Sequence, residues 1–246
     1  MIKNSGVWVK TFDELNKKFE SADTLSVLDY FLNIYKDKIA LASSLSIEDQ
    51  VLTHMILSIS NEAKIFTIDT GRLPAETYNL INKTNLQYKI KMDVYFPNNN
   101  SVEEMVKTKG INLFYESVEY RKECCNVRKI EPLKSALSGL EAWICGLRSE
   151  QSVTRSNMKL IEFDSANNLL KINPLINWTE EMVWDYIKKN NVPYNSLYKK
   201  NYKSIGCQPC TRIVTTGADI RSGRWWWENP ETKECGLHIQ QENKNG

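Results

Sequence analysis

The sequence predicts an α/β protein with a mostly parallel sheet and helices on both faces of that sheet. Short apolar runs alternate with stretches of helical periodicity along the 246-residue chain. This alternation is typical of parallel strands joined by covering helices. The length suits one large hydrophobic core. We therefore expect one domain over residues 1–224, followed by a mobile C-terminal tail over residues 225–246 that begins with three tryptophans and becomes polar.

The expected elements follow one another in a regular order. The first thirty-odd residues are expected to be helical, and Thr11 to Glu14 has the form of a capping box. Residues 158–163 and 169–172 flank a polar turn and predict a hairpin, after which Thr179 is expected to cap a helix reaching about residue 189. The remaining predicted strands are 39–42, 64–68, 88–94 and 142–145, with helices over 48–59 and from Pro74 onward.

Composition excludes several functional classes. The net charge of +2 is too small for a nucleic-acid surface, and no apolar run is long enough to cross a membrane. The first residues, Met1 to Trp8, lack the apolar stretch of a secretory signal, so we expect a cytoplasmic protein. Thiols stay reduced in that compartment, which makes disulfides an unfavourable explanation for the cysteines.

Cysteine spacing is the most informative feature of the chain. Cys124 and Cys125 are adjacent, and Cys207 and Cys210 form a C-x-x-C pair. Four thiols in two tight groups are typical ligands of one soft metal centre. Zinc remains an alternative, but its cysteines usually come from pairs spaced by two to four residues, so the adjacent pair favours a 4Fe-4S cluster. Cys235 lies outside this spacing and is predicted to be a separate thiol nucleophile.

Basic residues gather around these cysteines in the sequence. Arg121, Lys122, Arg128 and Lys129 surround the adjacent pair, and two arginines precede Cys235. Single arginines are most often surface charges, but this clustering indicates a site for a small, multiply charged anion.

Two loops are expected to lie at the carboxyl edge of the sheet. Ser43 to Ser46 follows the first strand, and Asp69 to Pro74 follows the second. Ligands of open α/β sheets bind at this edge, and hydroxyls with free amides at a helix N-terminus hold phosphate or sulfate. Capping of the helix by serine is the simpler alternative for the first loop. Together the two loops favour a nucleotide site.

Several motifs in order resemble one known family. They are FTIDTGRLPAETY over residues 66–78, the Cys124–Cys125 pair, C-x-x-C at 207–210 and ECGLH at 234–238. Together they resemble the assimilatory adenylylsulfate (APS) and phosphoadenylylsulfate (PAPS) reductase family of the iron–sulfur type, from about Leu41 to His238. One departure is that the serine loop lacks the glycines of a pyrophosphatase P-loop.

The resemblance implies a fold, an activity and a set of site residues. The fold would be like that of the adenine-nucleotide α-hydrolases, and the activity would be reduction of adenylylsulfate to sulfite and AMP, with thioredoxin or another dithiol as reductant, in sulfate assimilation towards cysteine. Cys235 matches the nucleophile, and Cys124, Cys125, Cys207 and Cys210 match the ligands of one 4Fe-4S cluster. The implied substrate-binding residues are Ser44, Ser46, Thr70, Gly71, Arg72, Lys129, Gly146, Arg148, Arg155, Arg221, Arg224 and His238.

Three alternatives stay open at this point. The enzyme could use PAPS, or both nucleotides. It could instead be an ATP-using adenylyltransferase or pyrophosphatase of the same fold, although the glycine-poor serine loop and Cys235 argue against this. It could also be a non-catalytic iron–sulfur or zinc module, which leaves Cys235 unexplained. The sequence leaves the oligomeric state open, a homo-oligomer included. Cys145 and His54 are predicted to be a core thiol and a packed histidine.

Overall fold

The structure is a computed structural model that describes residues 5–151, 155, 157–215, 217 and 219–229. These residues form two compact units, which are described separately. The described residues of unit 1 lie within 5–43, 47–65 and 139–192, and those of unit 2 lie within 44–46, 66–138 and 193–229. The strand order is β3-β2-β1-β4-β6-β5, and β2 (Lys64–Ile68) contributes its first two residues to unit 1 and its last three to unit 2.

Unit 1 holds four strands with a defined register. β1 (Ile39–Ala42) pairs in parallel with β4 (Ala142–Ile144), which pairs in parallel with β6 (Leu169–Ile172). β5 (Ile161–Asp164) runs antiparallel to β6 and forms the predicted hairpin. Every residue of β4 and β6 is buried, as expected for strands covered on both faces. The predicted class, α/β with a mostly parallel sheet, is confirmed.

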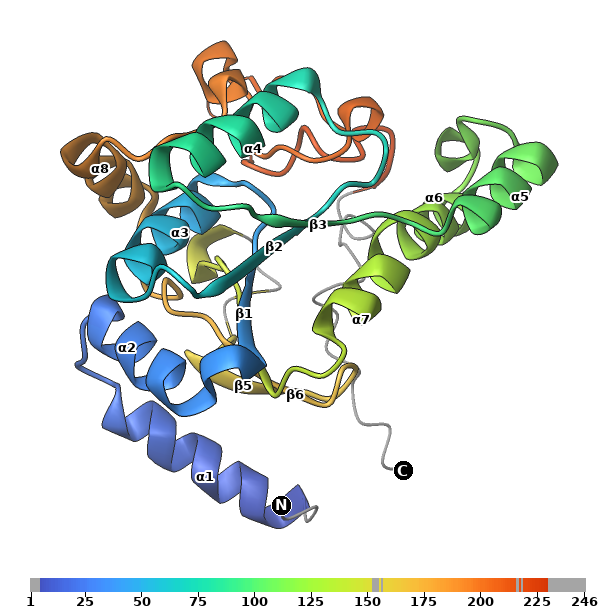
Figure 1. Cartoon of the computed structure of the whole chain (residues 1–246). Helices are drawn as coiled ribbons and strands as arrows, with labels where there is room; N and C mark the ends of the chain where they lie inside the picture. The colour runs from blue at the N-terminus through green and yellow to red at the C-terminus, as the bar shows by residue number, and fades with distance from the viewer. Residues whose placement is uncertain (1–4, 152–154, 156, 216, 218, 230–246) are drawn as a thin grey trace. The chain divides into compact units, whose positions relative to one another are not determined.

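Four helices belong to unit 1 (Figure 1): α1 (Ser5–Lys18), α2 (Thr24–Tyr35), α3 (Ile47–Ile59) and α8 (Glu180–Asn190). Asp23 caps α2 by accepting a hydrogen bond from the Ser26 amide at 2.9 Å. Thr179 caps α8 in the same way, accepting from the Met182 amide at 3.2 Å, which confirms its predicted role. The core of this unit includes the fully buried Trp143 and Phe31.

Unit 2 carries β3, α4 and a long helical run. Residues 66–68 of β2 pair in parallel with β3 (Asp93–Tyr95), and α4 spans Ala75–Tyr88 with Pro74 at its N-cap. α5 (Asn99–Lys109) comes next, capped by Asn98. α6 (Val118–Cys125) then continues through a π-helical turn, Asn126–Ile130, into α7 (Glu131–Leu137), as Figure 1 shows.

Three predicted boundaries are wrong. The first hairpin strand, expected from residue 158, starts only at Ile161. α1 begins at Ser5, so Thr11 lies within this helix and does not cap it. The strand predicted over 88–94 starts too early, because α4 extends to Tyr88 and ends at Lys89 in the left-handed conformation (φ 56°). Alternating apolar residues at 88, 90 and 92 imitate a strand, but the Met92 amide is bonded to the Asn85 side chain at 3.1 Å. None of the described helices is long and apolar enough to cross a membrane.

Candidate functional site

The adjacent cysteines lie at the end of α6. Ser117 caps this helix by accepting a hydrogen bond from the Tyr120 amide at 3.1 Å. Successive helical residues point about 100° apart, and accordingly Cys124 is buried whereas Cys125 is only half-buried. The π-helical turn follows directly, and such turns occur frequently at functional sites. This turn carries Arg128, which is buried, and Lys129, which is half-buried.

The second cysteine pair lies on a tight 3-10 turn, Gln208–Cys210. The Cys210 amide donates to the Cys207 carbonyl at 3.0 Å, which closes the turn. The Thr70 hydroxyl lies 3.2 Å from the Cys207 sulfur, and the Gln208 amide donates to the Arg72 carbonyl at 2.8 Å. The C-x-x-C turn is therefore bound to the loop that follows β2.

Arg128 connects that same loop to the π-helical turn. Its Nη1 donates to the Thr70 carbonyl at 2.8 Å. Gly71 adopts a positive φ of 70°, and a Cβ atom at this position would lie 3.3 Å from Arg128 Nη1. The left-handed backbone and the tight approach both favour glycine here. Thr70 thus contacts both cysteine-bearing segments, with its carbonyl on Arg128 and its hydroxyl beside Cys207.

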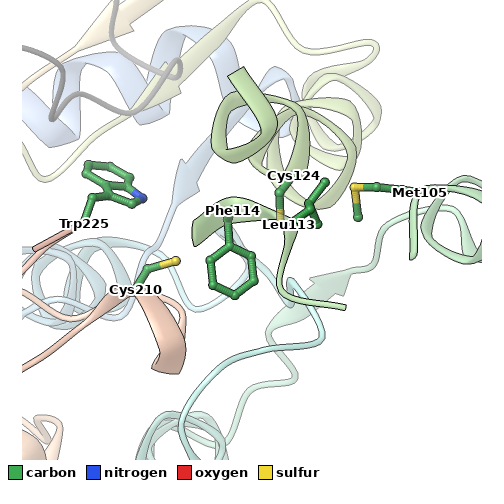
Figure 2. Close-up of a cluster of buried hydrophobic side chains, with 6 residues drawn as sticks. All are labelled: Met105, Leu113, Phe114, Cys124, Cys210 and Trp225. Carbon is green, nitrogen blue, oxygen red and sulfur yellow. The ribbon is translucent and has the colours of Figure 1, made fainter. Parts of the chain in front are cut away.

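All four cysteines come together in unit 2. Cys124 and Cys210 share one buried group with Met105, Leu113, Phe114 and Trp225 (Figure 2), and Cys207 packs against this group. Burial raises the pKa of Cys210. The neighbouring Cys207 raises this pKa further, Arg224 lowers it, and Cys125 and Cys124 add smaller increases. Burial likewise raises the pKa of Cys124, which Arg128 lowers. Each pair therefore lies within electrostatic reach of the other.

The donor set fits a soft metal group. The five described cysteines, these four and Cys145, are free thiols. Among the described residues, no group of three or more His, Cys, Asp or Glu side chains is placed to hold a single metal ion. Four thiols are the ligand set of a 4Fe-4S cluster, in which each cysteine binds a different iron atom and no compact one-metal group is needed. Arg128 beside Cys124, and Arg224 near Cys210, supply positive charge that favours thiolates.

The loop after β2 is rigidly held. Asp69 accepts hydrogen bonds from the Gly71 amide at 2.7 Å and from the Tyr78 hydroxyl at 2.9 Å. Burial and this bond to Asp69 raise the pKa of Tyr78 to about 12. The Arg72 guanidinium donates to the Ile111 carbonyl at 2.6 Å and to the Asn112 side chain at 2.9 Å. Arg72, which the resemblance implies binds substrate, therefore has structural partners on the segment before Phe114.

The serine loop is short and irregular. Ser43 is buried, Ser44 is exposed and Ser46 is half-buried. Leu45 between them has a positive φ of 62°, which is unusual for a leucine and indicates a constrained backbone. Ser44 and Ser46 belong to unit 2, as do Thr70 and Gly71.

The predicted site residues of unit 1 follow β4. A Cβ atom on Gly146 would collide with the Asp49 carboxylate and lie 3.1 Å from the Asp49 amide nitrogen, which favours glycine there. Arg148 is buried and its Nε donates to Glu48 Oε1 at 2.8 Å. Arg155 is also buried and donates to the Gln151 side chain. No motif marks Glu48 as the partner of Arg148, because the two residues are far apart in the chain.

The arginines near the end of the described chain contact Trp225. The guanidinium of Arg224 lies 4.9 Å from the centre of the Trp225 ring, and that of Arg221 lies 5.8 Å from it. Arg224 also donates to the Ile205 carbonyl at 3.3 Å. Cys235 and His238 lie outside the described residues. Trp225, expected to begin the mobile tail, is a buried member of the cysteine-bearing group.

One pair of residues at this site was missed entirely. Arg121 on α6 forms a two-point ion pair with Glu228, with both N–O distances at 2.8 Å. In the sequence, Arg121 stands out only by its charge, and no motif marks Glu228. Outside the site, Cys145 is buried at the end of β4, as predicted for a core thiol, and His54 is hydrogen-bonded to Tyr186 at 2.8 Å.

A family model decides where the chain belongs. The model of the phosphoadenosine phosphosulfate reductase domain matches residues 38–213. The chain belongs to this family. One relative is the adenosine 5'-phosphosulfate reductase of Allochromatium vinosum, which is 52% identical over 82% of this chain and 79% of that protein. Another is that of Burkholderia cepacia, which is 47% identical over 92% of this chain and 89% of that protein. A chloroplastic 5'-adenylylsulfate reductase of Arabidopsis thaliana is 40% identical over 98% of this chain and 54% of its own length.

Solved structures support the same fold. The phosphoadenylyl-sulfate reductase of Candida auris superposes with a TM-score of 0.73 and 27% identity, over 87% of this chain and 99% of that one. The FMN adenylyltransferase of Candida glabrata has a TM-score of 0.54 at 17% identity, covering 86% of this chain and 76% of that one, which shows likeness of fold alone. The expected fold, like that of the adenine-nucleotide α-hydrolases, is confirmed.

Proposed function

We propose that this protein reduces adenosine 5'-phosphosulfate to sulfite and AMP with electrons from a dithiol protein such as thioredoxin. The observation that carries the proposal is the gathering of four free thiols, from two distant segments, in a chain 52% identical to an adenosine 5'-phosphosulfate reductase. We place the reaction in the cytoplasm, in assimilation of sulfate towards cysteine, where thiols remain reduced.

The reaction begins with a thiolate attack. Cys235 attacks the sulfur of the phosphosulfate, an S–S bond forms, the bond from sulfur to the AMP oxygen breaks, and AMP leaves. The enzyme then carries an S-sulfocysteine. A thiolate of the reductant attacks the sulfur of Cys235 and expels sulfite. Its second thiol resolves the mixed disulfide and restores Cys235. The sulfur gains two electrons and the dithiol becomes a disulfide.

We assign the surrounding residues in keeping with this chemistry. Lys129, Arg221, Arg224 and His238 would neutralise the phosphosulfate and the charge that develops on the leaving phosphate. The two strand-end loops and the segment after β4 would hold the nucleotide. The proposed nucleotide-binding residues are Ser44, Ser46, Thr70, Gly71, Arg72, Gly146, Arg148 and Arg155.

We further propose that Cys124, Cys125, Cys207 and Cys210 hold one 4Fe-4S cluster. Their free thiols and the adjacent Arg128 and Arg224 support this assignment. When bound, the cluster would supply a charged group that orders the site and tunes the electric field at the substrate. A visible absorption spectrum with iron and zinc analysis distinguishes this cluster from a zinc module.

The experiment that tests the reaction isolates its first half. Incubation with adenylylsulfate and no reductant should release one AMP per active site and stop. The protein should gain the mass of a sulfonate on the peptide containing Cys235, and reduced thioredoxin should then liberate sulfite. Cys235→Ser should form no adduct and keep its AMP affinity. An adduct on Cys145, or full turnover by Cys235→Ser, would refute the assignment.

PAPS is the second candidate substrate. The match to the phosphoadenosine phosphosulfate reductase domain and the similarity to the Candida auris enzyme favour considering it. Turnover measured side by side on both nucleotides decides between an APS reductase, a PAPS reductase and an enzyme that uses both.

A further inference from the structure

The ion pair of Arg121 and Glu228 is unusually well buried for two charged residues. The Arg121 Nε donates to Glu228 Oε1, and its Nη2 donates to Oε2, each at 2.8 Å. The two side chains are only 1% and 2% exposed. The two parallel bonds fix both the distance and the orientation of the carboxylate relative to α6.

This pair attaches a short segment, Trp225 to Glu228, to both cysteine-bearing elements. Arg121 precedes Cys124 by less than one helical turn, and its guanidinium lies 4.7 Å from the centre of the Trp225 ring. The Trp225 amide donates to the Cys210 carbonyl at 3.2 Å, and the Glu228 amide donates to the Trp225 carbonyl at 2.9 Å. The segment is thus held from the cysteine helix on one side and from the C-x-x-C turn on the other.

Stability alone is a weak explanation for such a pair. The cost of removing two charges from water often cancels their attraction, and apolar residues of similar volume stabilise a core as well or better. A two-point ion pair adds a fixed register between the segments it joins, which apolar contacts specify less strictly. The feature therefore suggests a need for exact placement of residues 225–228.

The chain beyond Glu228 gives a reason for this placement. Cys235 follows Glu228 by seven residues, and a fully extended chain covers at most roughly 3.3–3.6 Å per residue, or about 25 Å in all. Because Glu228 is fixed, the length of the chain keeps Cys235 within about 25 Å of Glu228. Confinement raises the effective concentration of a thiol that must meet a bound substrate.

We propose that Arg121 and Glu228 are positioning residues that hold the start of the C-terminal segment in register with the cysteine helix, so that Cys235 reaches the bound adenylylsulfate. This inference rests on the proposed function. Neither side chain touches the substrate in this role; both act through the placement of Trp225 and the residues that follow.

The test removes the charge and keeps the size. Glu228→Gln should slow formation of the Cys235 adduct, measured as single-turnover AMP release, by tenfold or more. AMP affinity and iron content should change less than twofold. Hydrogen exchange at the amides of Trp225 and Glu228 should accelerate by at least tenfold. Arg121→Lys, which keeps the charge and loses the two-point geometry, should give an intermediate rate.

Lys171→Met is the matched control for general destabilisation. Lys171 forms another buried pair, with Glu162 at 3.4 Å, on the β5–β6 hairpin of unit 1. The Lys171→Met protein should lose stability and keep the wild-type rate of adduct formation. The proposal is overturned if Glu228→Gln forms the adduct at the wild-type rate, or if its AMP affinity and iron content fall in proportion to the rate. A wild-type protein that forms no adduct on Cys235 refutes the proposed function instead, and the positioning role of the pair with it.

Discussion

Replacing Glu48 by glutamine should cost a large part of the stability of this protein. Glu48 accepts a 2.8 Å hydrogen bond from Arg148 Nε, and the two side chains are 4% and 2% exposed. Glutamine keeps the size and one acceptor but removes the negative charge. Arg148 would then be a buried cation without its main counter-charge. Breaking a buried pair in this way typically costs about 3–5 kcal/mol.

The structure places this variant at the lower end of that range. Arg148 also contacts Glu150 at 3.3 Å, but Glu150 is 54% exposed, so solvent screens most of its attraction. A loss of about 3 kcal/mol corresponds to a fall in Tm of roughly 6–12 °C for a chain of this size. Differential scanning calorimetry of the purified protein measures this shift directly.

A surface pair provides the control. Asp13 and Lys159 are 3.0 Å apart and both 61% exposed, so Asp13→Asn should change the stability by less than about 0.5 kcal/mol. If Glu48→Gln melted within about 2 °C of the wild type, the buried charge of Arg148 would not need Glu48 for its stabilisation. The assignment of Glu48 as its counter-charge would then be wrong.

Three further predictions concern the cysteines, Arg224 and pH. Cys124→Ser or Cys210→Ser should abolish iron binding and the broad absorbance at roughly 400 nm that thiolate-to-iron charge transfer produces. Cys145→Ser should retain both. Equal iron loss in all three variants would overturn the ligand set. Arg224→Ala should lower kcat/KM for adenylylsulfate about tenfold or more, since a charge-assisted bond contributes about 1.5–3 kcal/mol. Its effect on AMP binding, measured by calorimetry, should be smaller. Equal losses for both ligands would place Arg224 away from the phosphosulfate. Burial lowers the pKa of His54, so the unfolded state binds more protons than the folded state. The free energy of unfolding should therefore fall as pH drops below about 6.5 and through the folded-state pKa. Chemical denaturation of His54→Gln should show a shallower dependence of this free energy on pH, and an unchanged dependence would exclude His54 as its cause.

Much of the fold follows from local patterns in the sequence. β1 and the hairpin strand β6 have the predicted bounds, because short apolar runs between polar turns have few alternatives. Helix boundaries were harder, as Thr11 shows: its capping pattern is overridden by a helix that starts at Ser5. The segment from α5 to α7 escaped prediction. Its helical run contains a π-helical turn, which shifts the periodicity partway through.

The site was predictable only where residue type alone carries chemistry. The four cysteines were found because thiols in this spacing have few other uses. The spacing predicted that the two cysteine pairs share one centre. It could not show that Cys124 and Cys210 pack around Phe114 and Trp225, because this depends on how distant segments fold. Glu228 and Glu48 were missed for the same reason. A buried carboxylate is recognised by its partner, and both partners are about a hundred residues away in the chain.

The π-helical turn after Cys125 limits how this part of the chain can change in length. The Glu131 amide donates to the Asn126 carbonyl, five residues back, where an α-helix would bond four residues back. Deleting one residue here would restore a regular α-helix with every backbone bond satisfied. It would also turn α6 by about 100° relative to α7, whose buried face includes Leu133 and Leu137. A deletion that improves the helix would thus carry the cysteine pair away from the C-x-x-C turn, and insertions or deletions between Asn126 and Ile130 should be among the least tolerated in the protein.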